Sequence, residues 1–528
     1  MQSPRFPIRN LNFTISGRLL KPEPPGAPCH PEQPSFNNAT CAYVAAAWGN
    51  STFHDQDPIS VDYGNWSNDS CLPSPVYPCS ARSYPVYVVN ASSALEVKHG
   101  VDFARDKNIR LIVKSTGHDY LGRYISTPHQ TLSTWTHYIR GLSFHAGFTP
   151  KGYGYQIDTT AVTAGASLQM AEIYNEAGMR NQTIVGGMDL TVSLGGIITG
   201  GGHSPLSATY GLGADQVLEV EIVTAGGEIL TANECQNSDL FWAVRGGGGH
   251  SFGIVTSFTV KTFPTAPVTQ LNILIGAAFD SEAYWNRMAY VLSQSPYLSD
   301  SGVSAYTYIA RQVNATTSSF EGIFFAFNTS ITALLEVFAP IQQYINFTWP
   351  SQTLVEAAPT QFPDFIPWWL SNVDPTGVGK NDLLGSRLLD GQALSHPLPV
   401  LENTLRNAVP NSPPAIAHII SGKGVWNAKP RGGAYVHFAE LATENALRAQ
   451  YTEALRKVNP NSGCYLNEAC LHFLPPKYQY AFWGTNYPRL LQIKHKVDPL
   501  NVFWCHPCVG DEEWAEGGGA YVGYDSMR

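Results

Sequence analysis

One histidine of the chain stands in a glycine-containing turn, where it could react with a bound molecule. His118 lies in the sequence Ser-Thr-Gly-His-Asp-Tyr-Leu-Gly-Arg, residues 115–123, directly after the apolar run 110–114. Glycines at 117 and 122 let backbone N–H groups approach an anionic ligand without a Cβ in the way. Because neutral imidazole is a nucleophile, His118 could form a covalent bond to an electrophilic carbon of that ligand. The alternative is a histidine that only forms hydrogen bonds within its turn.

Two further glycine-rich stretches indicate a backbone that lies close to a ligand. Residues 190–204 hold five glycines in the eight positions 195–202, and residues 239–256 hold four in a row at 246–249. One turn does not need so many glycines, whereas a main chain in contact with a ligand over several residues does. Neither stretch has the spacing of a dinucleotide-binding or P-loop motif, which disfavours a Rossmann or P-loop enzyme. A tight corner of a β-sheet is the alternative.

Length and composition limit the class of protein. The 528 residues, 44% hydrophobic and 14% charged, predict a globular chain of two or more domains. The net charge of −9 is spread along the chain without basic runs, so we expect no nucleic-acid partner. Apolar stretches fall short of the roughly 20 residues that a membrane span needs, so we expect no membrane association. Residues 1–26 do not have the pattern of a signal peptide.

Glycosylation sequons nevertheless favour secretion. The chain has ten Asn-x-Ser/Thr sequons, more than chance comfortably supplies, so we expect N-linked glycans and an extracellular location. The sequons are at Asn12, Asn38, Asn50, Asn65, Asn68, Asn90, Asn181, Asn314, Asn328 and Asn346.

The cysteines point to the same oxidising compartment. Four of them crowd into a Pro- and Asn-rich opening segment, and we expect disulfides between neighbours, Cys29 with Cys41 and Cys71 with Cys79. Four buried free thiols are the alternative. For Cys505 and Cys508 we expect a structural disulfide, with each other or with Cys464 or Cys470, rather than a thioredoxin-type redox pair. No cluster of residues predicts a metal site.

The expected elements are those of an α+β fold with an antiparallel sheet in its second half. Strand 86–89, helix 92–107 and strand 110–114 form a β-α-β opening. The other helices are expected at 169–177, 279–293, 332–344, 443–458 and 486–496. The other strands are expected at 156–158, 217–224, 253–262, 304–308, 322–327, 416–420, 433–438 and 501–504.

Taken together, the three glycine-rich stretches resemble the vanillyl-alcohol-oxidase superfamily, and more closely the berberine-bridge-enzyme-like oxidoreductases of fungi. The sequences Gly-Thr-Asn-Tyr-Pro-Arg-Leu, residues 484–490, and Asp-Pro-Leu-Asn-Val-Phe-Trp, residues 498–504, are similar to the closing element of that family. The resemblance covers about residues 80 to 510. It implies a two-domain PCMH-type FAD-binding fold, α+β, with an antiparallel-sheet substrate domain. The implied parts are an N-terminal disulfide-stapled extension (1–82), the FAD-binding domain (83–265), the substrate domain (266–460) and a berberine-bridge-like element that returns to the FAD domain (461–528).

The resemblance also implies how FAD is held. The loop histidine of this family forms an 8α-N1 bond to the flavin, so His118 is the expected attachment point. Some relatives add a second bond from a cysteine six residues before the paired glycines, but this chain has Asp189 there, so we expect a single covalent tether. The other residues expected to hold FAD are Ser115, Thr116, Gly117, Asp119, Tyr120, Gly122, Asp189, Thr191, Val192, Ser193, Gly195, Gly196, Gly200, Gly201, Gly202, His203, Gly253, Val255, Tyr465 and Asn501.

Catalysis would need a group that takes a proton from a substrate O–H or N–H while hydride leaves for the flavin. Tyr435 and His437 share one face of their expected strand by i, i+2 spacing. Tyr465 stands where the Tyr-x-Asn stretch of the family approaches the flavin ring, and it is the first candidate for base or substrate anchor. Glu468 is the second candidate. Each of these residues could instead form structural hydrogen bonds.

The sequence therefore predicts an FAD-dependent oxidoreductase. We expect an oxidase that transfers hydride from a small organic substrate, such as an alcohol, sugar or secondary metabolite, to flavin N5. Reoxidation by dioxygen would then yield hydrogen peroxide. One alternative is a flavin-bearing isomerase or cyclase of secondary metabolism without net redox chemistry. The other is a glycosylated binding protein without catalysis, in which the glycine-rich stretches are sheet corners.

Overall fold

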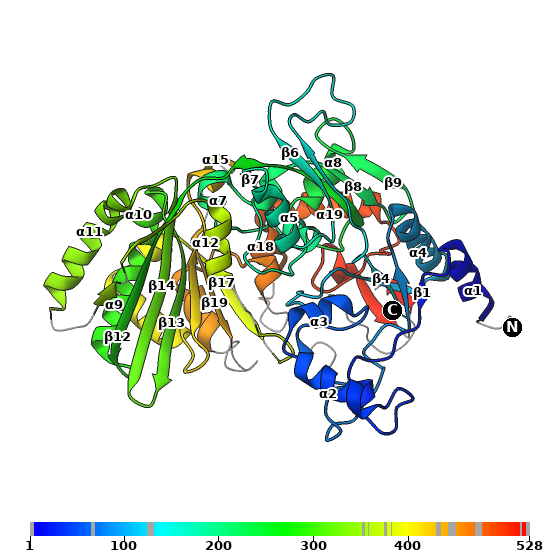
Figure 1. Cartoon of the computed structure of the whole chain (residues 1–528), viewed down its shortest axis with the longest axis horizontal. Coiled ribbons are helices and arrows are strands. Elements are labelled where there is room, and N and C mark those ends of the chain that lie inside the picture. Colours follow the sequence, from blue (N-terminus) through cyan, green and yellow to red (C-terminus); the bar gives the residue numbers. More distant parts are fainter. Residues whose placement is uncertain are drawn as a thin grey trace.

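The computed structural model describes most of the chain as two lobes that lie side by side (Figure 1). The described residues are 5–64, 69–123, 131–350, 354–356, 358–373, 377–381, 383–428, 434–441, 450–469, 478–517 and 520–523. The sequons at Asn65 and Asn68, Cys470 and residues 443–449 of an expected helix lie outside the described residues.

The first lobe opens with the expected β-α-β unit, which the structure confirms. Strands β2 (Tyr87–Asn90) and β3 (Arg110–Lys114) both pair in parallel with β4 (Thr131–Trp135), which lies between them. Helix α4 (Ala94–Lys107) connects β2 to β3. Its N-cap is Ser93, whose hydroxyl accepts the Glu96 N–H, and it ends where Asn108 takes a left-handed conformation with φ 50°. His118 follows directly on β3.

A five-stranded antiparallel sheet completes the first lobe. Its order is β5-β6-β10-β8-β9. The strands are β5 (Leu142–His145), β6 (Ala161–Gly165), β8 (Val217–Val223), β9 (Ile229–Ala232) and β10 (Ile254–Lys261). Helices α5 (Met170–Gly178), α6 (Leu194–Thr199) and α8 (Ser238–Val244) share one hydrophobic core with it. The expected strand at 156–158 is wrong, because Ile157 makes an isolated bridge to Phe148.

The second lobe is built on an eight-stranded sheet with the order β15-β12-β14-β13-β18-β19-β17, in which β16 also pairs with β12. The strands are β12 (Val268–Ala278), β13 (Ser304–Asn314), β14 (Thr317–Phe327), β15 (Leu354–Glu356), β16 (Thr360–Phe362), β17 (Leu384–Asp390), β18 (Ala415–Ile419) and β19 (Ala434–Leu441). All the pairings are antiparallel, as predicted.

The two faces of this sheet have different partners. Helices α9 (Glu282–Ser293), α11 (Ile331–Thr348) and α14 (Leu398–Ala408) bury one face in a core of its own. From the other face, Tyr306 and Phe325 belong to the core of the first lobe. Because alternate residues of a strand point to opposite faces, His437 on β19 lies on the face away from the helix-side residues Val436 and Phe438. The sheet thus presents His437 toward the first lobe.

The N-terminal segment joins the first lobe and does not stand apart from it. Helix α1 (Arg5–Thr14) packs near α4, and β1 (Leu19–Leu20) pairs antiparallel with β2. Helices α2 (Asn38–Ala47) and α3 (Ser51–Gln56) follow. The disulfides Cys29–Cys41 and Cys71–Cys79 are present, which confirms the predicted pairing.

The C-terminal segment also returns to the first lobe. Helix α19 (Tyr487–Val497) contacts α8, and the Cys505–Cys508 disulfide follows it. The expected strand at 501–504 is wrong. A turn occurs there, because the backbone N–H groups of Val502 and Phe503 donate to the Asp498 carboxylate, which the buried Lys494 also contacts at 2.7 Å. None of the helices in the described part of the chain is long and apolar enough to cross a bilayer.

Candidate active site

The three glycine-rich stretches, far apart in the sequence, meet in the first lobe. Nε2 of His118 lies 2.7 Å from the hydroxyl of Thr191, which joins the first stretch to the second. The N–H of Gly248 donates to the carbonyl of Thr199 at 2.9 Å, which joins the third stretch to the second. The side-chain amide of Asn467 donates to the carbonyl of Ile197 at 3.3 Å and brings in the C-terminal segment. We call this region the glycine-lined site.

His118 stands between two carboxylates. Its Nδ1 lies 3.2 Å from Oδ2 of Asp62, and its Nε2 lies 3.6 Å from Oδ1 of Asp189. Asp189 is held in place by the backbone N–H groups of Thr191 and Val192, which donate to Oδ1 at 2.7 and 3.2 Å. The loop histidine therefore has an aspartate near each of its ring nitrogens.

Open space beside the main chain fits a bound group in the glycine-lined site. Among the described atoms, a Cβ on Gly196 would meet nothing within 4 Å, and a Cβ on Gly201 would meet only the Tyr465 ring, at 3.9 Å. Gly201 has φ 114°, a conformation that side-chain-bearing residues rarely adopt. The side-chain amide of Asn501 is buried and has no partner among the described residues. These features fit a large polar cofactor such as FAD.

Tyr465 lies at the border of the two lobes, next to the second glycine-rich stretch. Its hydroxyl accepts a hydrogen bond from the amide of Asn467 at 3.1 Å. Burial raises the pKa of Tyr465 and the nearby Glu468 carboxylate raises it further, while hydrogen bonds from Asn467 and from the backbone of Gly202 and His203 act in the opposite direction. Tyr465 is therefore a protonated phenol at neutral pH.

Glu468 links this tyrosine to two histidines. Its Oε1 lies 2.7 Å from Nε2 of His203, and its Oε2 lies 3.4 Å from Nδ1 of His437. Burial would raise the pKa of Glu468, but His203, which also hydrogen-bonds to it, His437 and His418 together outweigh burial and lower this pKa to about 2. The Nδ1 of His203 is buried and has no hydrogen-bond partner within the described part of the chain.

The second lobe contributes histidines that are uncharged at neutral pH. Burial lowers the pKa of His437 to about 4, although Glu468 opposes the shift. His418 on β18 is the register partner of His437, and burial lowers its pKa well below the ordinary value. We call His203, His437, Tyr465 and Glu468 the acid–base cluster.

The structure separates Tyr435 from this cluster. Its ring packs against Trp426, 5.0 Å away between centroids, and its hydroxyl interacts with Asp300. The expected shared face of Tyr435 and His437 is wrong, because the pairing of β19 with β17 is irregular between Ala434 and Val436 and Tyr435 packs against the helix-side core.

The remaining expected cofactor residues mostly shape the backbone. The Ser115 hydroxyl donates to that of Ser167 at 2.9 Å, and Asp119 pairs with Arg123 at 2.8 Å. Gly253 has φ 150°, and a Cβ there would lie 2.7 Å from the carbonyl oxygen of Val223, so close strand packing alone requires this glycine. Tyr120 stacks on Tyr63, with ring centroids 4.5 Å apart. The positions of the other expected residues are Thr116 (buried), Gly117 (φ 110°), Gly122 (φ 68°), Ser193 (N-cap of α6), Gly195 (bonded to Ala166), Gly200 (against Asn467), Gly202 (φ 73°) and Val255 (on β10).

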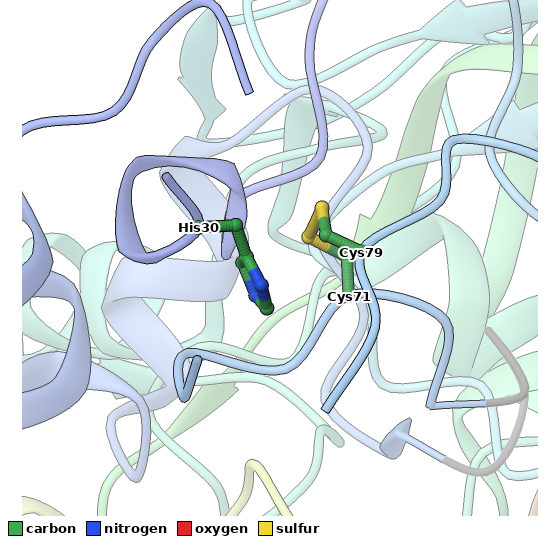
Figure 2. A group of neighbouring side chains, drawn as sticks. All are labelled: His30, Cys71 and Cys79. Atoms are coloured by element: carbon green, nitrogen blue, oxygen red, sulfur yellow. A yellow bond between two sulfur atoms is a disulfide. The ribbon is translucent and has the colours of Figure 1, made fainter. Parts of the chain in front are cut away.

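One group of described residues has ligand atoms close enough together for a metal ion, and it lies in the N-terminal segment (Figure 2). It consists of His30, Cys71 and Cys79. The two sulfur atoms are bonded to each other, and Nε2 of His30 lies 2.8 Å from the carbonyl oxygen of Leu72. Since a disulfide offers no thiolate, we assign this group a structural role.

Comparison with known families matches two parts of the chain that contribute to the glycine-lined site. A family described as "FAD binding domain" matches residues 85–233, and one described as "Berberine and berberine like" matches residues 464–510. An uncharacterized FAD-linked oxidoreductase of Arthroderma benhamiae is 35% identical to this chain over 97% of the chain and 92% of its own length. This chain belongs to the VAO-type, berberine-like family of FAD-linked oxidoreductases.

Other members of the family are similar to this chain over almost their whole length. The VAO-type flavoprotein oxidase VAO615 of Thermothelomyces thermophilus is 31% identical over 96% of this chain and 90% of its own. The crystal structure of the VAO-type flavoprotein MtVAO713 from Myceliophthora thermophila has a TM-score of 0.90 at 28% identity, and the match covers 99% of this chain and 98% of that one. The predicted family, the α+β fold of the PCMH type, the FAD cofactor and the oxidoreductase class are thus confirmed.

Sequence reasoning missed two features of the site. Asp62 was not expected near His118, and the signal that could have suggested it is an acidic residue within the otherwise uncharged run 58–64. The pairing of His203 with Glu468 was also missed, because 265 positions separate the two residues.

Proposed function

We propose that this FAD-linked oxidoreductase is a secreted oxidase that carries its FAD on a single bond to His118. The observation that supports this most strongly is the position of His118, where two glycine-rich stretches meet. Bound FAD would accept hydride from a small organic substrate, such as an alcohol, sugar or secondary metabolite, and deliver the electrons to dioxygen. The name of the relative VAO615 as a flavoprotein oxidase supports this choice of electron acceptor.

The proposed bond joins Nδ1 of His118 to the 8α carbon of the flavin. The Thr191 hydroxyl, 2.7 Å from Nε2, would then hold the other side of the linked imidazole. Asp189 has no thiol and is occupied with the N–H groups of Thr191 and Val192, which supports one tether and not two. The main chain at 116–122, 191–202 and 253–255 and the amide of Asn501 would hold the rest of the cofactor.

The acid–base cluster would handle the substrate proton. Tyr465, protonated at neutral pH, would anchor the substrate oxygen or nitrogen beside Gly201. In the tautomer in which Nε2 of His203 donates to the Glu468 carboxylate, Nδ1 of His203 carries a lone pair that has no hydrogen-bond partner among the described residues. A carboxylate that orients an imidazole in this way makes the free nitrogen a proton acceptor. His437, uncharged at neutral pH, would line the substrate side of the site.

Secretion is supported by the disulfides and by the surface positions of sequons. The described residues contain three disulfides and also expose asparagines suited to N-linked glycans. The sequon asparagines that are exposed in the described structure are Asn38, Asn50, Asn181, Asn314, Asn328 and Asn346.

Two measurements on the purified holoenzyme test this proposal. On a denaturing gel, the wild-type band should show flavin fluorescence and the His118→Ala band should not. Fluorescence that survives in His118→Ala would refute the tether. A screen of alcohols, sugars and aromatic metabolites should then find a substrate whose turnover releases hydrogen peroxide. Turnover without hydrogen peroxide and without consumption of dioxygen would refute the oxidase and identify the isomerase or cyclase alternative.

A further inference from the structure

The N-terminal segment delivers a fully buried carboxylate to the proposed tether. Asp62 has no solvent-exposed surface, and neither of its oxygens has a hydrogen-bond donor with good geometry among the described residues. A buried carboxylate without hydrogen bonds is destabilising and is retained where it has a role. The nearest basic group that the structure gives it is Nδ1 of His118, at 3.2 Å.

The backbone around Asp62 is held from two sides, so the carboxylate cannot easily turn away. The carbonyl of Asp62 accepts the N–H of Gly379 at 2.7 Å, and Tyr63 pairs with Lys380 in a parallel bridge. On the other side, the Tyr63 ring stacks on Tyr120, two residues after His118. The segment is thus fixed between the histidine loop (residues 115–123) and residues 379–380 of the second lobe.

A buried lysine joins the same segment to the strand that carries the histidine loop. Nζ of Lys114, at the end of β3, donates to the carbonyls of His54 and Asp57 at 3.1 and 2.9 Å. A Cβ on Gly117 would lie 3.6 Å from the Ser60 carbonyl oxygen, so the histidine loop runs directly along residues 54–62. These contacts place Asp62 against His118 in a fixed arrangement.

We propose that Asp62 accepts the Nδ1 proton of His118 when this nitrogen bonds to the 8α carbon of FAD. The inference rests on the proposed tether and adds the group that makes it form. In the overall step one methyl C–H bond and the Nδ1–H bond break and a C–N bond forms. Two protons and two electrons leave, and dioxygen takes them up as hydrogen peroxide. Removal of the Nδ1 proton makes this nitrogen a nucleophile.

The electrostatics of Asp62 suit a proton acceptor that works near neutral pH. Burial raises its pKa to about 6, against the effects of His118 and Lys114, which lower it. General bases are most effective when their pKa lies near the working pH. Asp189 and Asp55, the other carboxylates that influence Asp62, raise its pKa further.

The test compares three variants of the holoenzyme. Asp62→Asn keeps the size of the side chain and removes the base, whereas Asp62→Glu keeps a carboxylate. The matched control is Asp55→Asn, a buried carboxylate in the same segment that pairs with His137 at 2.9 Å and not with His118. Total flavin per chain is read from visible absorbance, and the bonded fraction from the flavin that stays with the protein after acid denaturation.

We expect Asp62→Asn to bind FAD but to bond at least about 10-fold less of it than wild type after equal time in air. Asp55→Asn should keep most of the wild-type bonding, because it leaves the Asp62 carboxylate in place, and Asp62→Glu should recover part of the bonding. Wild-type levels of bonded flavin in Asp62→Asn would overturn the inference while the tether stands. Failure of Asp62→Asn to bind FAD at all would also overturn it, because Asp62 would then serve assembly of the site. If the proposed tether is itself absent, the wild-type protein will release all its flavin on acid denaturation, which distinguishes this outcome from the others.

Discussion

A buried glutamate behind the acid–base cluster makes the stability of this oxidoreductase depend on pH. Glu440 on β19 is fully buried, its Oε1 accepts the Thr452 hydroxyl at 2.7 Å, and its Oε2 has no partner in the described part of the chain. Burial raises the pKa of Glu440 from 4.5 to about 8, and the bond from Thr452 opposes this only in part. The folded protein therefore keeps this proton at neutral pH, whereas the unfolded chain releases it.

The sign and size of the effect follow from proton linkage. Because the folded state holds more protons between pH 4.5 and about 8, the free energy of unfolding falls as the pH rises through this window. From these two pKa values, the loss is about 1 kcal/mol at pH 5 and about 3 kcal/mol at pH 7. Glu440→Gln cannot ionise and avoids the loss. The stability of the variant relative to wild type should thus improve by about 2 kcal/mol from pH 5 to pH 7.

Urea unfolding of wild type and Glu440→Gln at pH 5 and pH 7 measures this difference. Glu321→Gln, at an exposed position of the same sheet, serves as the control for the exchange of glutamate for glutamine. If the difference between wild type and Glu440→Gln is the same at both pH values, Glu440 does not hold a proton in the folded state and the reasoning is refuted.

Further predictions concern the site itself. Tyr465→Phe should bind FAD normally but lower kcat about 10- to 100-fold, measured as dioxygen consumption with an identified substrate, and an unchanged kcat would exclude Tyr465 as substrate anchor. Glu468→Gln should lower kcat by a similar factor because its neutral amide no longer stabilises a proton that His203 takes up. His203→Asn in the same background should add little, whereas additive losses would contradict a shared role. Gly196→Ala should leave the apoprotein at least as stable, since alanine favours helix α6, yet weaken FAD binding. The control is Gly276→Ala, because Gly276 on β12 of the second lobe also has open space around its Cβ position. Equal FAD binding by the two variants would show that Gly196 does not face the cofactor.

Local signals made much of the fold predictable from the sequence. Helix α4 begins at a serine cap and ends at a left-handed asparagine, and both signals directly flank the helix. The disulfides of the N-terminal segment join neighbours only 8 and 12 positions apart. Where an apolar run stood alone, the prediction failed: residues 501–504 read as a strand, but the Asp498 carboxylate binds their N–H groups and makes a turn.

The candidate site was predictable where glycine marks a backbone in contact with a ligand. The second stretch and His118 were identified in this way, and the structure brings them together. Asp62 as a partner of His118 and His203 as a partner of Glu468 were not predictable, because both lie outside helices and strands and far from these residues in sequence. Asp62 reaches His118 from the N-terminal segment, and His203 meets Glu468 of the C-terminal segment. Such contacts depend on the packing of distant segments, which no short pattern encodes.

The bond between His118 and FAD can be measured directly, because trypsin isolates the histidine loop. Cleavage after Lys114 and Arg123 releases residues 115–123 as one peptide with a single histidine. Mass spectrometry of the digested wild-type holoenzyme should find this peptide with the added mass of the flavin, and fragmentation should place that mass on His118. An unmodified peptide from a protein that binds FAD, or a flavin attached to a different residue, would contradict the account.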